Sequence, residues 1–159
     1  MRAYQIAKNL ARELATNSDI SKLVAGLYQG KQLLVFMDTI GQRDFEAENI
    51  DIFPCIVIAT DSASGGRGKD KVVNINAVIS TRLPSEVDIT KPLSTDVNNL
   101  LMVPGFDGLT ELCGKIVEIL ENANLGAFYQ GYSIDYDLES QAPVQYATLQ
   151  LEFTELHSF

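Results

Sequence analysis

The chain has 159 residues, of which 46% are apolar and 21% are charged. These values match ordinary globular domains, so they exclude a disordered or collagen-like chain and predict an apolar core. Twelve Lys and Arg against 21 Asp and Glu give a formal charge of −9. This charge argues against binding nucleic acid or an anionic membrane surface, because both require a dominant positive field.

The N-terminal part predicts two helices followed by a strand. Apolar residues recur at three- and four-residue steps over 2–16, which is typical of an amphipathic helix. A short second helix is expected over 19–30, capped by Asp19 or Ser21. No uncharged apolar run reaches the roughly 18 residues of a membrane span, and the N-terminus lacks the apolar stretch of a signal peptide. We therefore expect no membrane partner. Residues 32–39, after the second helix, are expected to form a strand.

The middle of the chain predicts a hairpin with a long tip. A strand over 55–60 should begin after Pro54, because a proline inside the ladder would remove a donor. Residues 61–70 are rich in Ser and Gly and predict a mobile loop, and residues 73–80 alternate as a half-buried strand does. The loop, taken as 61–71, is basic through Arg67, Lys69 and Lys71.

An arm and a helix are expected next. Residues 82–105 hold three prolines and no period, which predicts an extended arm longer than most loops. Residues 107–122 carry one apolar stripe and predict a helix with Asp107 as its N-cap.

The last part of the chain predicts an antiparallel hairpin. Residues 128–139 and 144–156 both alternate with period two. The alternation turns Tyr132 toward the core and leaves Tyr129 and Tyr146 exposed, where aromatic residues suit contacts with a protein partner. The outward acidic residues of the first strand are Asp135, Asp137 and Glu139.

The order of these elements predicts an α+β fold in a single domain over 1–159. We expect a mostly antiparallel sheet with two main helices packed on one face, a long hairpin loop and an extended arm. Residues 31–52 are longer and more polar than a simple connection needs, and the pattern assigns them no further element.

The residues available for catalysis are few. Cys55 and Cys113 lie in apolar stretches and are expected as buried thiols, although their spacing alone leaves a disulfide open. His157 is the only histidine. The glycine-rich segment has Ala63 and Asp70 where a phosphate-binding loop needs Gly and Ser or Thr. We therefore predict no catalytic, cofactor-binding or metal-binding residues and no enzyme.

The charges are unevenly distributed. No Lys or Arg follows Lys115, and the last part of the chain carries seven acidic residues. A basic loop and an acidic strand can join copies head to tail, whereas the simpler reading is two solvated faces. The candidate interface residues are Arg67, Lys69, Lys71, Asp135, Asp137, Glu139, Tyr129 and Tyr146.

One family has a similar arrangement. The strand pattern Phe-Pro-x-Ile-x-Ile over 53–58, the long hairpin loop, the helix over 107–122 and the terminal hairpin through 132–136 and 149–153 resemble tail-terminator (tail-completion) proteins of long-tailed bacteriophages. The resemblance spans about residues 3–156 and rests on architecture more than on a sharp motif.

The resemblance implies a structural virion protein at the head–tail junction, assembled in the host bacterial cytoplasm. Such proteins form a homohexameric ring that caps the tail tube, stops its polymerisation and offers a docking surface to the neck or head-completion protein. DNA would pass through without specific binding, and no cofactor is implied. The alternatives are a small cytoplasmic ferredoxin-like enzyme or ligand-binding domain, a dimeric adaptor, or another head–tail joining component.

Overall fold

The computed structural model describes residues 2–37, 52–82, 92, 96–100, 106–137 and 144–155. These ranges contain three helices, namely α1 (Arg2–Thr16), α2 (Ser18–Leu27) and α4 (Phe106–Asn122). They also contain five strands, namely β1 (Leu34–Met37), β2 (Cys55–Gly66), β3 (Lys69–Arg82), β4 (Phe128–Tyr136) and β5 (Val144–Glu155).

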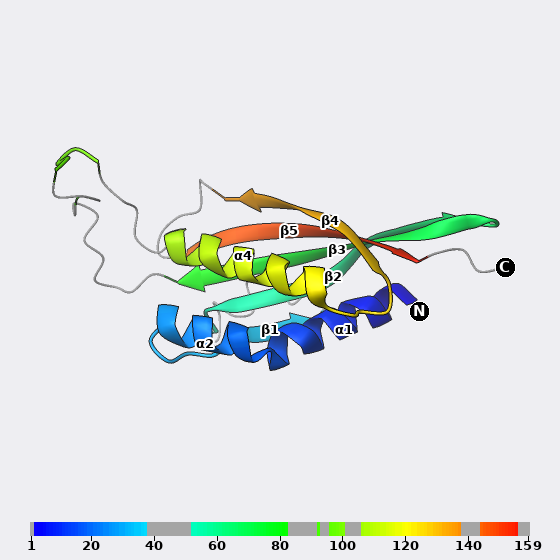
Figure 1. Ribbon diagram of the computed structural model, residues 1–159, viewed down its shortest axis with the longest axis horizontal. Helices are drawn as coiled ribbons and strands as arrows, with labels where there is room; N and C mark the ends of the chain where they lie inside the picture. Colours follow the sequence, from blue (N-terminus) through cyan, green and yellow to red (C-terminus); the bar gives the residue numbers. More distant parts are fainter. Residues whose placement is uncertain are drawn as a thin grey trace.

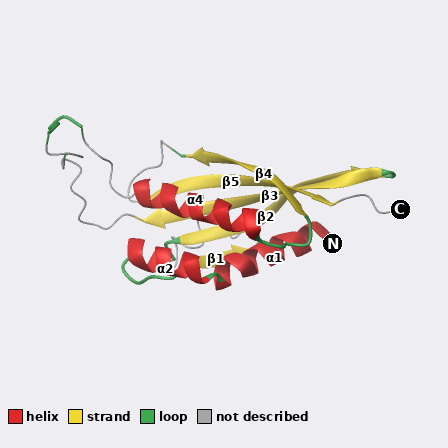
Figure 2. Cartoon of the chain, viewed as in Figure 1, coloured by secondary structure: helices red, strands yellow, loops and turns green. Residues whose placement is uncertain are grey.

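The strands form one open sheet in the order β1-β2-β3-β5-β4. Strand β1 runs parallel to β2, and the other neighbours are antiparallel. The helices lie against one face of this sheet, with α4 crossing β3 and β5 and with α1 beside β1 (Figures 1 and 2). The predicted α+β class, with a mostly antiparallel sheet, is therefore confirmed.

The core lies between the helices and this face of the sheet. Alternate residues of the long strands are fully buried there, including Ile75 on β3 and Leu149 on β5, as the period-two pattern predicts. The helices contribute stripes that include Leu10 and Leu112. Burying each such side chain stabilises the fold by about 1.5–3 kcal/mol, so this layer specifies which sheet face the helices cover.

Both predicted helix caps are wrong by a few residues. Asn17 Oδ1 accepts hydrogen bonds from Asp19 N at 2.9 Å and Ile20 N at 3.1 Å, so Asn17 caps α2 in place of Asp19 or Ser21. Helix α4 begins at Phe106, which puts Asp107 inside the first turn, where a negative charge suits the helix dipole. The predicted end at residue 122 is confirmed.

The loop predicted over 61–70 is wrong, because β2 and β3 continue through it as a hairpin. Only Arg67 and Gly68 separate the paired residues Gly66 and Lys69, and Gly68 takes the positive φ of 76° that such a turn requires. Small polar residues have weak strand preference of their own. The strands extend here because the hydrogen-bond ladder between β2 and β3 continues from the core into this segment. The arm predicted over 82–105 lies mostly outside the described residues.

Candidate functional site

A two-stranded extension projects from one end of the sheet. We call residues 61–71 the basic ribbon, and all of them are exposed. Within the described residues, pairing of β3 with β5 ends at Lys71 and Glu155, so residues 65–70 have only each other as strand partners there. Figure 1 shows this extension passing beyond the rest of the sheet. Register shifts between Thr60 and Ser62 and between Ser64 and Gly66 bend it further.

The lysines of the basic ribbon lie over its glycines. A Cβ atom at Gly65 would stand 3.0 Å from Lys71 Cγ, and one at Gly66 would stand 3.6 Å from Lys69 Cδ. The contact at Gly65 is tighter than most Cβ contacts, so the missing side chain leaves room for the stem of Lys71, whereas the distance at Gly66 is an ordinary contact. Among the described residues, none forms an ion pair with Arg67, Lys69 or Lys71.

The opposite face of the sheet carries the acidic candidates. In the described part of the chain no helix covers this face, which we call the open face. Asp135 of β4, Asp137 directly after the end of β4, and Glu152 of β5 are exposed on it, and we call this set the acidic face. Tyr146 is half-buried beside them, one strand inward. Glu139 lies outside the described residues.

The sequence predicted the wrong face of the strand for Tyr129 and too much burial for Tyr132. Tyr132 was expected in the core and is 51% exposed, whereas Tyr129, expected outside, packs against the core with its ring 5.7 Å from that of Phe153. Tyr132 does lie on the predicted helix-side face, opposite Leu151, but β4 is an edge strand and its ring is exposed. The bulge between Tyr129 and Gly131 inserts one residue and puts Tyr129 on that same face. Gly131 has a φ of 155°, and its presence in a strand is the only signal of the bulge in the sequence.

The environment of Tyr129 is unfavourable to its ionised form. Burial, with smaller contributions from Glu121 and Tyr132, raises the pKa of Tyr129 from 10.0 to about 12. Its hydroxyl is buried and has no hydrogen-bond partner among the described residues. Tyr129 is therefore half-buried and packs against the core, in place of the exposed position that the alternation predicted.

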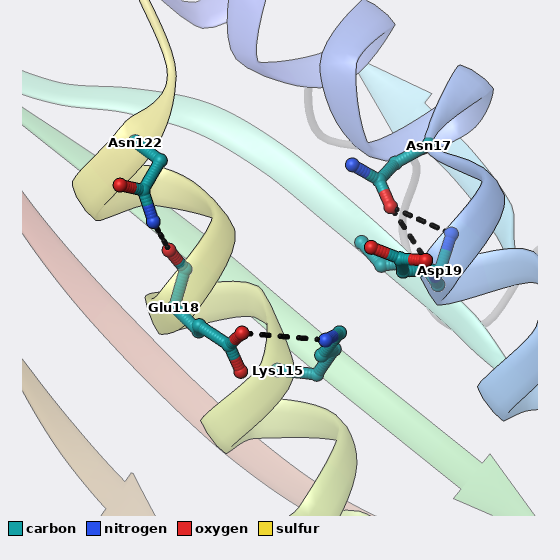
Figure 3. Close-up of polar contacts among 6 residues, drawn as sticks. Asn17, Asp19, Lys115, Glu118 and Asn122 are labelled. Atoms are coloured by element: carbon teal, nitrogen blue, oxygen red, sulfur yellow. Dashed lines mark hydrogen bonds and ion pairs between the residues drawn. The ribbon is translucent and has the colours of Figure 1, made fainter.

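A groove that the sequence analysis missed separates α2 and α4. It has a volume of about 560 Å³ and charged walls, with Lys115 and Glu118 3.4 Å apart on α4 and Asp19 on α2 facing them (Figure 3). Charged residues on the exposed stripe of a helix look like a solvated face in sequence, so no signal distinguished this groove. Its lining residues are Asp19, Lys22, Leu23, Glu111, Gly114, Lys115 and Glu118.

Both cysteines are buried, and neither forms a disulfide. Both Cys55 and Cys113 are free, which decides between the two alternatives in favour of thiols. Burial raises the pKa of Cys55 to about 11 and that of Cys113 to about 12. Each thiol therefore stays protonated near neutral pH and acts as a small core residue.

The described residues contain no group of three or more His, Cys, Asp or Glu placed to hold a metal ion. In the same part of the chain, no helix is long and apolar enough to cross a membrane. The structure thus brings Asp135, Asp137 and Tyr146 together at one end of the open face and holds the three basic candidates at the other end of the sheet.

Comparison with known proteins adds no relative: no protein-family model matches the chain, and no curated protein matches it in sequence.

Proposed function

We propose that the protein is a structural subunit of a phage tail that assembles as a homohexameric ring, caps the tail tube and receives the head-side neck protein. The proposal begins from the resemblance of the element order to tail-terminator proteins. It places the protein in the virion, at the junction of head and tail, after assembly in the bacterial cytoplasm. It gives the protein no catalytic role and no cofactor.

One structural observation carries the proposal. The eleven residues of the basic ribbon, 61–71, are all exposed, so the ribbon adds almost nothing to the core. Ordering such a segment costs backbone entropy of about 1–2 kcal/mol per residue. Binding free energy from a partner that covers the ribbon would offset that entropy cost. A segment of this kind is expected in a subunit that assembles with other chains.

The charge of the chain also suits the proposed position. A formal charge of −9 gives the wall of a ring few groups that would replace the counterions of DNA. DNA can therefore pass through such a ring without being retained.

Tube length tests the proposal. We expect tubes grown from the tail-tube protein of the same phage to stop growing when this protein is added, and electron micrographs to show a six-fold ring at one end. The same protein with Gly68→Ala and Lys71→Glu serves as a ribbon-defective control. Tubes of unchanged length, with no ring at either end, contradict the proposal.

The groove between α2 and α4 supports a second candidate, a small ligand-binding domain. Its walls present Lys115 and Glu118 across from Asp19, a combination suited to a zwitterionic ligand. A Gly114→Leu variant would fill the groove, because nothing lies within 4 Å of a Cβ atom there. If a screen of zwitterionic amino acids raises the melting temperature of the unmodified protein and not of this variant, the ligand-binding function is favoured.

A further inference from the structure

Strand β4 is an edge of the sheet, because β5 is the only strand that pairs with it among the described residues (Figure 1). Just past the end of β4, Asp137 N donates a hydrogen bond to Tyr146 O at 3.1 Å. An antiparallel ladder turns the backbone groups of every second residue to the same side, so those of Asp135 also point toward β5. The backbone groups of Tyr132 and Ile134 therefore point out of the sheet, where no described strand meets them.

Residues 131–136 of this edge have little of the protection that edge strands usually have. Lysines, prolines and inward-pointing charges commonly prevent such a strand from pairing with another chain. This stretch contains no Lys and no Pro, and its one charged residue is Asp135. On the helix-side face it presents Tyr132, which is 51% exposed, and the half-buried Ile134. The free edge of β4 is therefore suited to accept one more strand.

A hollow on the open face lies beside the same edge. It has a volume of about 320 Å³, and Gly131, Gln150 and Glu152 are among its lining residues. Gly131 lies directly opposite Glu152, so no side chain stands between the Glu152 carboxylate and the free edge in that pair. An added strand would stand about 4.8 Å from β4 and about 10 Å from β5, a span that a Lys or Arg side chain and a Glu side chain bridge together.

The charges at this edge select the chemistry of the added strand. Asp135 follows Gly131 by four residues, so the carboxylates of Asp135 and Glu152 lie about 13 Å apart along the strand direction. Both residues are exposed, and neither forms an ion pair among the described residues. A second copy paired through its own β4 would bring more carboxylates to these two, and its β1, which has no charged residue, would leave them unpaired. A strand of another protein, with cations at the matching positions, is favoured.

We infer that the free edge of β4 binds an extended segment of a partner protein by antiparallel strand addition, and that this segment has the pattern cation, apolar, polar, apolar, cation. One cation reaches Glu152 across Gly131, and the other meets Asp135. The two apolar side chains cover Tyr132 and Ile134 on the helix-side face. The inference requires no contact between copies, so it goes beyond the proposed ring and does not depend on it.

A synthetic peptide tests the pattern of side chains. The sequence Thr-Lys-Val-Thr-Val-Lys-Thr, with blocked ends and a fluorescent label, places its lysines four residues apart. The sequence Thr-Val-Lys-Thr-Lys-Val-Thr has the same composition, but its lysines are too close together to meet both carboxylates. We expect the first peptide to bind about fivefold more tightly than the second at low salt, because it forms one more ion pair and covers both apolar side chains. Fluorescence anisotropy measures both dissociation constants.

Methylation of the peptide nitrogens separates strand addition from adsorption by charge. In antiparallel pairing the N–H groups of the two valines face Tyr132 and Ile134, whereas those of the two lysines point away from β4. N-methylation of both valines should weaken binding about tenfold or more, and N-methylation of both lysines should leave it within about threefold. The bound peptide should also slow hydrogen exchange at the amides of Tyr132 and Ile134, which nuclear magnetic resonance measures residue by residue.

Two variants of the protein test the charges. Glu152→Gln and Asp135→Asn each remove one carboxylate at an exposed position, and each should weaken binding of the first peptide about threefold. Glu111→Gln is the matched control, because this exposed residue of α4 lines the groove beside α2 and does not lie at the sheet edge. It makes the same change in net charge and should leave the constant within about 1.5-fold.

Four results overturn the inference. They are a first peptide that does not bind, two peptides that bind equally, an equal loss of binding from valine and lysine methylation, and protection of the Tyr132 and Ile134 amides by raised protein concentration alone. The last result would assign the edge of β4 to a second copy. The tube-length assay contains no peptide, so its outcome decides the proposed function and leaves this inference to the peptide measurements.

Discussion

The hydroxyl of Tyr129 is a local source of instability in the core. It is buried without a hydrogen-bond partner among the described residues, while its ring packs 5.7 Å from Phe153. A buried polar atom without a partner costs about 1–3 kcal/mol, so Tyr129→Phe should raise the free energy of unfolding by about 1 kcal/mol. Denaturant titration measures the change. Tyr132→Phe is the matched control: that ring is 51% exposed, and the variant should stay within about 0.5 kcal/mol of the parent.

The two buried thiols predict that the stability of the protein falls at alkaline pH. In the unfolded chain they titrate near 9.0, whereas burial raises the folded pKa of Cys55 to about 11 and that of Cys113 to about 12. Between these values the unfolded state has lost protons that the folded state keeps, so rising pH favours unfolding. Below about pH 8 both states are protonated and this dependence vanishes.

We therefore expect the free energy of unfolding to fall above about pH 9, by up to about 1.4 kcal/mol per pH unit for each thiol. Urea titrations at a series of pH values measure this slope. Cys113→Ala removes one of the two groups and should reduce the slope, whatever it does to stability at neutral pH. An equal slope in the variant and the parent would show that other groups control the alkaline transition.

At the scale of the element, α4 contains a glycine that its packing does not need. Gly114 is exposed in the middle of the helix, and a Cβ atom there would have no neighbour within 4 Å. Gly114→Ala should stabilise the protein by about 0.5–1 kcal/mol, because alanine loses less backbone entropy on forming a helix. Thermal unfolding followed by circular dichroism checks this gain. Gly108→Ala is the control, since its Cβ would lie 3.3 Å from Tyr28 Oη and should give a smaller gain or a loss.

The elements predicted correctly from the sequence are those with an unbroken apolar period and a single buried face. Helix α1, helix α4 and the buried alternation of β3 and β5 follow directly from such patterns. The bulge after Tyr129 was not predictable by periodicity, because one inserted residue shifts the phase without changing composition. The ribbon was missed because Ser and Gly have no strand preference of their own, and the hydrogen bonds that form it come from its continuation of the core ladder.

The sequence predicted which charged residues cluster, but it did not predict where these clusters lie on the sheet. Charge clustering identified Arg67, Lys69 and Lys71 together with the aspartates, because clusters of one sign are visible in any linear sequence. Their placement at opposite ends of the sheet depends on the strand order β1-β2-β3-β5-β4, which no local pattern encodes. The groove between α2 and α4 depends on tertiary packing for the same reason.

At the scale of the whole molecule, folding and assembly should be separable. Residues 65–71 are exposed, and Ser64 lies directly opposite Val72 in the hairpin. Replacing 65–71 by Asn-Gly joins these two residues with a turn that strands accept readily. The shortened protein should melt within a few degrees of the parent, because no buried side chain is removed.

Its assembly should nevertheless be lost. Light scattering should report a monomer under conditions in which the full-length protein associates, because Lys69, Lys71 and Arg67 are all removed while the acidic face is intact. A shortened protein that assembles normally would mean that copies meet through surfaces other than the ribbon, whereas one that fails to fold would make the ribbon part of the folding unit. The predicted combination, an unchanged melting temperature with no assembly, is the behaviour expected when a segment is ordered by its own ladder and used only by a partner.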